Sequence, residues 1–129
     1  MTGAHKYGAT NANGHRRRQL IARVKARDTH CAICGGLLVP DAPHLDPRST
    51  VIDEDIPRAR GGSPLDPSNC NATHRACNQW KSTLTLAEAH KLLQLGATVG
   101  QKLTRQQRRQ LLRQGKPTTK WQPAATRWK

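Results

Sequence analysis

Two pairs of potential metal ligands, separated by 40 residues, constrain the fold of this chain more than any other feature. Cys31 and Cys34 form a CxxC pair, and His74 and Cys77 form an HxxC pair. Two ligands three residues apart can bind one ion from a single turn, and a distant second pair completes a tetrahedron. The spacing therefore predicts a structural zinc site. Cys70 lacks chelating spacing and is predicted to be a small core residue.

Length and charge limit the classes of protein that fit. A chain of 129 residues supports one small domain with tails, and its core must be modest because it has no Phe and is only 35% hydrophobic. It carries 22 Lys and Arg against 8 Asp and Glu, a formal net charge of +14. Such a field attracts polyanions, of which nucleic acid is the usual one.

The N-terminal sequence has no secretion signal, and no stretch approaches the roughly 20 apolar residues that span a bilayer. These absences predict a cytoplasmic protein with no membrane partner. In that compartment a CxxC pair favours metal binding over a disulfide, and a thioredoxin-like redox site would need a βαβ context that is not seen around Cys31.

Hydrophobic spacing predicts a small α+β domain. A disordered arm over residues 1–13 precedes a basic amphipathic helix over His15–Arg27, and two short strands over 37–39 and 50–53 form an antiparallel hairpin with a long connection. A helix beginning near Asn71 carries the second ligand pair toward Lys81.

The C-terminal third is predicted to be helical and basic. Thr85 and Glu88 form a capping box that opens a helix ending at Gly96, and a second helix covers residues 104–113. The tail, residues 116–129, shows no core pattern. Its two tryptophans fit base stacking, docking on a partner, or simple disorder.

Three consecutive acids, Asp53-Glu54-Asp55, stand out in a chain with only eight acidic residues. Hard divalent cations prefer oxygen ligands, so three acids in a row are evidence for a functional site. Side chains alternate along a strand, so Asp53 and Asp55 are expected on one face and Glu54 on the other.

The ordered set of motifs resembles the HNH endonuclease family, which has a ββα-metal fold. The matching elements are spread over roughly residues 15–82: Cys31-Ala-Ile-Cys34-Gly35, Asp53-Glu54-Asp55-Ile56-Pro57, Gly61-Gly62, Asn69, His74-Arg-Ala-Cys77-Asn78 and Lys81. The small basic format is similar to stand-alone HNH proteins of bacteriophages and their actinobacterial hosts. The resemblance implies a phage-related protein in the cytoplasm of a bacterial host cell.

By position, the resemblance implies that Asp53 and Asn78 hold a catalytic Mg²⁺ or Mn²⁺ and that Asn69 braces the loop after the strand. The family places a catalytic His where this chain has Glu54. Glu54 can be the general base, an additional metal ligand, or the mark of an inactive site, and His44 is a substitute base. The likeliest phosphate contacts are Arg58, Arg60, Arg75 and Lys81.

These expectations combine into one prediction. The fold is α+β, with a zinc-stapled ββα-metal domain over residues 14–82, basic helices over 83–115 and a tail over 116–129. The function is metal-dependent DNA cleavage, with structural zinc and catalytic Mg²⁺ or Mn²⁺. The alternatives are a zinc module that binds DNA without cutting it, and a structural protein whose tail binds a phage terminase or another packaging protein.

Overall fold

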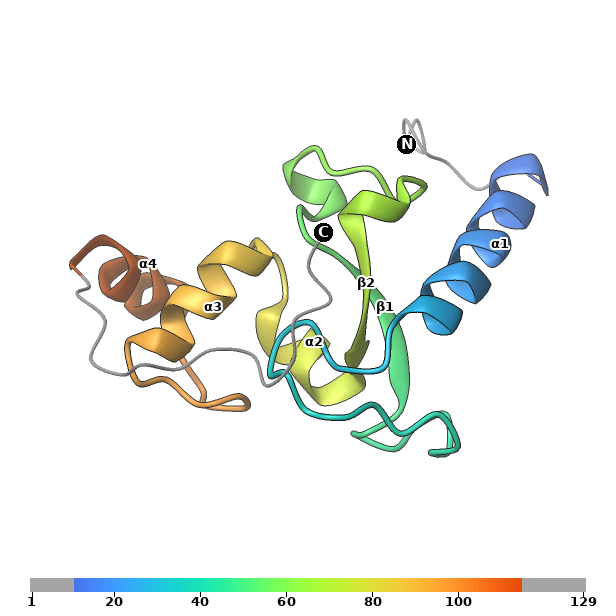
Figure 1. Cartoon of the computed structure of the whole chain (residues 1–129). Coiled ribbons are helices and arrows are strands. Elements are labelled where there is room, and N and C mark those ends of the chain that lie inside the picture. The colour runs from blue at the N-terminus through green and yellow to red at the C-terminus, as the bar shows by residue number, and fades with distance from the viewer. Residues whose placement is uncertain (1–10, 115–129) are drawn as a thin grey trace.

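A computed structural model describes residues 11–114 of the chain. Over that range it contains four α-helices and a two-stranded antiparallel sheet, in the order α1 (Asn11–Arg27), β1 (Thr50–Glu54), β2 (Cys70–His74), α2 (Arg75–Lys81), α3 (Leu86–Gln94) and α4 (Arg105–Gln114). Two short 3₁₀ helices, Arg58–Arg60 and Pro67–Asn69, lie between the strands. The sheet lies between α1 on one side and α3 and α4 on the other (Figure 1). The mixed α/β class agrees with the prediction, whereas most of the predicted arm and the tail from residue 116 lie outside the described residues.

Helix α1 ends at Arg27, as predicted, but begins at Asn11, so residues 11–13 are helical rather than part of a disordered arm. No proline interrupts this stretch, and a single interior glycine costs a helix only about 1 kcal/mol. Leu20 and Val24 are one turn apart on the buried face, where they pack against Cys70 and Ala72 of β2.

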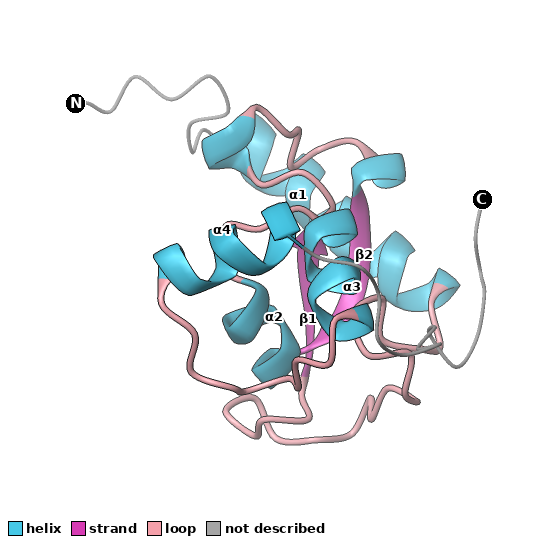
Figure 2. Ribbon diagram, turned by 90° about the vertical axis from the view of Figure 1, so that its left-hand side faces the viewer, coloured by secondary structure: helices cyan, strands magenta, loops and turns pink. Residues whose placement is uncertain are grey.

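The sheet differs from the predicted hairpin. Strand β1 pairs with β2, with Val51 opposite Thr73 and Asp53 opposite Asn71. Residues 37–39 do not form a strand, because Leu37 makes only an isolated bridge to His30 and the residue is 68% exposed. Figure 2 shows the two strands side by side among the helices.

Helix α2 begins at Arg75 and not near Asn71, because residues 70–74 are a strand. The side chains of Cys70, Asn71, Ala72 and Thr73 are buried. The outer edge of β2 is also covered: the Asp28 carboxylate accepts from the Ala72 N–H at 2.9 Å, and the Ala32 N–H donates to the Ala72 carbonyl at 3.1 Å. A buried edge strand needs such partners for its backbone groups.

The C-terminal helices follow the prediction closely. Thr85 and Glu88 form both hydrogen bonds of a capping box at the start of α3. The apolar face of α3 then packs into a core with Ile33, Cys77 and Trp80. Helix α4 lies against α3, and its Leu111 and Leu112 pack on the edge of the same core. None of the described helices is both long enough and apolar enough to cross a membrane.

Candidate functional site

The first ligand pair lies on a tight turn. Gly35 has φ of +79°, a left-handed conformation that glycine adopts without strain. This turn is closed by hydrogen bonds from the Cys31 N–H to the Gly36 carbonyl at 2.8 Å and from the Gly35 N–H to the Cys31 carbonyl at 2.9 Å. The Gly36 N–H then points to the Cys34 sulfur at 3.4 Å. The turn therefore presents both sulfurs to one point.

The second pair arrives from the junction of β2 and α2. His74 is the last residue of the strand, and Cys77 lies in the first turn of the helix. The Sγ atoms of Cys31, Cys34 and Cys77 and a ring nitrogen of His74 all lie within 4.8 Å of one another. The predicted Cys3His set is confirmed as a cluster that could hold a metal ion, and it is the one such cluster of His, Cys and acidic groups found within residues 11–114.

The tautomer of His74 is fixed by a backbone group. Its Nε2 lies 2.8 Å from the Leu37 carbonyl, which can only accept a hydrogen bond, so Nε2 carries the proton. The lone pair of Nδ1 then faces the sulfurs of Cys34 at 3.4 Å and Cys77 at 3.8 Å. A ligating imidazole is usually oriented in this way, through a hydrogen bond from its other nitrogen.

The sulfurs carry the electrostatics of a cation site. Hydrogen bonds from Cys31 and Cys77 lower the pKa of Cys34 to about 3. The pKa of Cys77 is raised, mainly by its hydrogen bonds with Cys31 and Cys34 and to a smaller extent by burial. Packed thiolates repel one another unless a cation neutralises them. Three sulfurs and one imidazole nitrogen are also a preferred donor set of structural zinc. The residues present therefore fit this ion.

Cys70 is separate from the cluster. It is fully buried against α1, and burial raises the pKa of its thiol to about 11. Its predicted place in the core is confirmed.

The three consecutive acids point to three different partners. Asp53 forms an ion pair with Lys81 of α2 at 2.9 Å, and Glu54 forms one with Arg17 of α1 at 3.1 Å. Asp55 accepts a hydrogen bond from the Asn71 side chain. The structure thus separates Asp53 from Glu54, as the strand alternation predicts. Burial raises the pKa of Asp53 despite the opposing effect of the nearby ammonium group.

Lys81 is not an exposed phosphate contact, and that prediction is wrong. Its side chain is completely buried, and its Nζ donates to the Glu54 carbonyl at 2.9 Å as well as to the Asp53 carboxylate. Asn78 and Lys81 are three residues apart, so their side chains lie on one face of α2. Asn78 therefore lies on the side of the helix that approaches β1, and it is half-buried.

Asn69 holds the loop that follows β1, as the resemblance implies. Its Oδ1 accepts from the Ile56 N–H at 2.9 Å, and its Nδ2 donates to the carbonyls of Ile56 at 3.1 Å and Ser63 at 3.0 Å. The loop closes so tightly that a Cβ on Gly62 would lie 1.6 Å from the Ile56 carbonyl oxygen. The backbone after the acids is therefore firmly positioned.

The three remaining predicted phosphate contacts lie at or near the surface. Arg58 and Arg60 are each about half exposed, and they approach Glu54 and Glu88 respectively. Arg75 is partly buried at the start of α2. His44 is exposed on the loop before β1, at the opposite end of that strand from Glu54, which does not suit a substitute base.

Sequence reasoning missed the inward role of Arg17. Its guanidinium reaches the Glu54 carboxylate and donates to the Pro64 carbonyl at 2.5 Å. The signal was present in the spacing, since Arg17 lies three and seven residues before the buried Leu20 and Val24.

No protein-family model matches this chain, and neither the curated proteins nor the solved structures contain a match to it.

Proposed function

We propose that this protein is a metal-dependent DNA endonuclease with a ββα-metal core of the HNH type. One observation carries the proposal: Asp53, at the end of β1, directs its carboxylate to α2, the helix that also carries Asn78. The sequence motifs supply the resemblance, and the order β1, β2, α2 with the Cys3His cluster at the β2–α2 junction is compatible with it.

Asp53 and Asn78 would hold the catalytic ion. Mg²⁺ and Mn²⁺ prefer carboxylate and amide oxygens as ligands. Because the Lys81 ammonium pairs with the Oδ2 atom of Asp53, the ion would bind through the other carboxylate oxygen. When bound, such an ion supplies positive charge to the scissile phosphate and the leaving oxygen. Asn69 keeps the following loop in place, and Arg58 provides a half-exposed positive charge beside it.

The role of Glu54 decides between an endonuclease and a protein that only binds DNA. Its carboxylate contacts Arg17 on α1, on the side away from Lys81 and Asp53. To act as a general base, the Glu54 carboxylate would have to accept a proton on the side that faces Arg17, or break its ion pair with Arg17. As a structural residue it would tie α1 to the sheet. This pairing favours the second candidate, a zinc module that binds DNA without cleaving it.

Relaxation of supercoiled plasmid by the zinc-loaded protein tests the proposal. We expect nicking with Mg²⁺ or Mn²⁺ and none without added ion. Asn78→Ala should abolish it, whereas Gln79→Ala, an exposed neighbour on α2, should not. A base contributes about 10²- to 10⁴-fold, so Glu54→Gln should lose at least 100-fold if Glu54 is that base. DNA binding without nicking in either ion would overturn the endonuclease and favour the binding module.

A further inference from the structure

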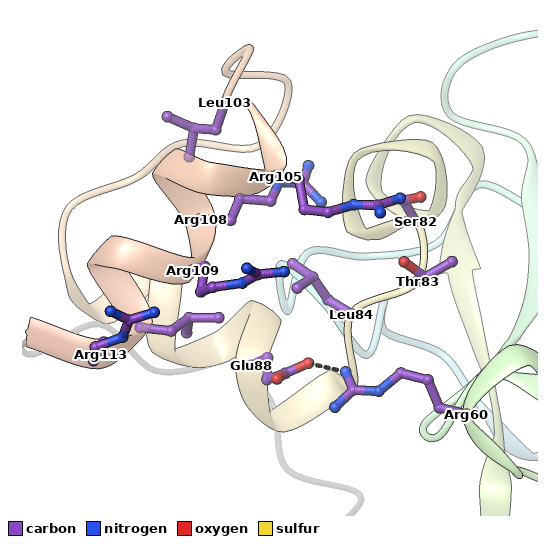
Figure 3. Close-up of a pocket in the computed structure, with 11 residues that line it drawn as sticks. Arg60, Ser82, Thr83, Leu84, Glu88, Leu103, Arg105, Arg108, Arg109 and Arg113 are labelled. Carbon is purple, nitrogen blue, oxygen red and sulfur yellow. Dashed lines mark hydrogen bonds and ion pairs between the residues drawn. The ribbon is translucent and has the colours of Figure 1, made fainter.

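A strongly basic cleft is lined mostly by residues that follow the segment with the nuclease-like motifs. It has a volume of about 740 Å³ and is formed by α4, the start of α3, the segment 82–84 and the turn after β1 (Figure 3). Glu88 is the one acidic side chain in its lining, against five arginines: Arg60, Arg105, Arg108, Arg109 and Arg113. An excess of fixed positive charge in a concave surface focuses the field on an anionic ligand.

Two of the arginines are occupied by the protein itself. Arg108 donates to the carbonyls of Trp80 and Lys81 at the end of α2, and its guanidinium lies 5.7 Å from the centre of the Trp80 ring. These contacts cap α2 and fix α4 to the core. Arg60 forms an ion pair with Glu88.

The other three arginines form a regular row. Arg105, Arg109 and Arg113 are exposed and four residues apart, so they rise by about 6 Å each along one face of α4. Within residues 11–114 their side chains form no ion pair with an acidic group. Their charge is therefore left for a ligand.

The lining of the cleft is connected to the candidate nuclease site by short stretches of chain and by one backbone hydrogen bond. Segment 82–84 directly follows Lys81, and Arg60 lies on the turn six residues after Glu54. The Leu86 N–H donates to the Asp55 carbonyl at 2.9 Å, which joins the start of α3 to the acidic segment. A strand of nucleic acid at Asp53 and Asn78 could thus continue into the cleft.

We propose that this cleft binds the phosphodiester backbone of DNA, with Arg105, Arg109 and Arg113 as the phosphate contacts. This inference rests on the proposed function for the choice of DNA, but it requires binding only and not cleavage. Guanidinium groups bind phosphate oxygens in bidentate fashion, and contacts of this kind position a duplex without reading its sequence. The cleft therefore extends the DNA-binding surface beyond the catalytic core.

Salt-dependent DNA binding by the full zinc-loaded chain, without Mg²⁺ or Mn²⁺, tests this proposal. The slope of log K against log salt is negative, and each lost phosphate contact reduces its magnitude by about 0.9 on duplex DNA. The triple variant Arg105→Gln, Arg109→Gln, Arg113→Gln should therefore reduce the magnitude of the slope by about 2 to 3. A control variant with the same loss of charge, Arg16→Gln, Arg18→Gln, Arg23→Gln on the exposed face of α1, should lower it by less. Equal losses in both variants would overturn the proposal.

Glu88→Gln gives a change of opposite sign that damage to the fold would not produce. Glutamine can keep the capping hydrogen bond while it removes the one negative charge from the cleft and releases Arg60. We expect tighter DNA binding, and weaker binding would overturn the proposal. A protein that binds DNA with the expected slopes but does not nick plasmid would refute the endonuclease and retain the cleft. Unchanged slopes in a protein that nicks would do the reverse.

Discussion

The Cys3His cluster and the segment Asp53-Glu54-Asp55 are both prominent in the sequence, but the fold arranges their side chains in opposite ways. Four ligands from two segments 40 residues apart converge within 4.8 Å. Three acids that are consecutive in sequence diverge to Lys81, Arg17 and Asn71. Residues three apart on a turn face one point, whereas neighbours on a strand face opposite sides. Proximity in sequence is therefore a poor guide to a shared site unless the local structure is known.

The two regions also balance charge differently. The cluster brings three cysteine sulfurs together, and a bound cation would neutralise the negative charge of their thiolate forms. The acidic segment is neutralised by the chain itself, with Lys81 on one face of the strand and Arg17 on the other. A cation bound to the first region would join its two segments, whereas the ion pairs of the second region join α1 and α2 to the sheet.

Loss of zinc should have the largest effect. Binding of structural zinc contributes an apparent free energy of about 10–16 kcal/mol near pH 7, which is at least comparable to the whole stability of a small domain. We expect Cys77→Ser, or a strong zinc chelator, to abolish the cooperative thermal unfolding transition measured by circular dichroism. Metal analysis should find one zinc per chain in the wild type and less than that in the variant.

Cys70→Ala is the matched control for this prediction. It also removes a buried thiol, but one outside the cluster, so it should keep one zinc per chain and a cooperative transition. Full zinc content and an unchanged melting temperature in Cys77→Ser would contradict the prediction, and the contrast between the two regions would fail.

The elements with strong local signals could be predicted from the sequence. The end of α1, the capping box of α3 and helix α4 follow from periodicity and capping residues, and the ligand set follows from spacing. Each depends on residues within a turn or two of one another, so no knowledge of the tertiary fold is needed.

Strand pairing and burial could not be predicted in the same way. Residues 70–74 are followed directly by helix α2, and only their pairing with β1 makes them a strand. A lysine at the end of a helix is expected on the surface, but Lys81 is buried because it pairs with Asp53, which is distant in sequence. Both errors concern contacts between segments far apart in the chain, where tertiary structure overrides local propensity.

Breaking the Lys81–Asp53 pair should have the second largest effect. Removing one partner of a buried pair leaves an uncompensated charge and costs about 3–5 kcal/mol. Lys81→Met should therefore lower the free energy of unfolding by that amount in urea titrations. The double variant Lys81→Met, Asp53→Asn should recover part of the loss, and exposed Lys102→Gln should change little.

The pH dependence identifies the carboxylate as the cause. Burial raises the pKa of folded Asp53 above its ordinary value of 3.8, and loss of the Lys81 ammonium raises it further. The folded state then binds the proton more tightly than the unfolded state, so stability falls as pH rises from about 3.8 through the folded pKa. The deficit of Lys81→Met relative to wild type should grow as the pH rises above 3.8. A deficit that is independent of pH would show that lost packing, and not Asp53, is responsible.

The smallest expected effect comes from alanine substitutions at two glycines, one from each region. An alanine at Gly62 would place its Cβ 1.6 Å from the Ile56 carbonyl oxygen and 2.9 Å from the Asn69 amide, so backbone must move. Forced movement of this kind costs about 1–3 kcal/mol, which should lower the melting temperature by roughly 10 °C. An alanine at Gly36, beside the Cys3His cluster, would meet Cys34 and His74 only at 3.5 and 3.7 Å, and this variant should melt near the wild type. If both variants melt alike, the loop after the acids is not held by Asn69, and the acidic segment lacks the rigid support that a catalytic site requires.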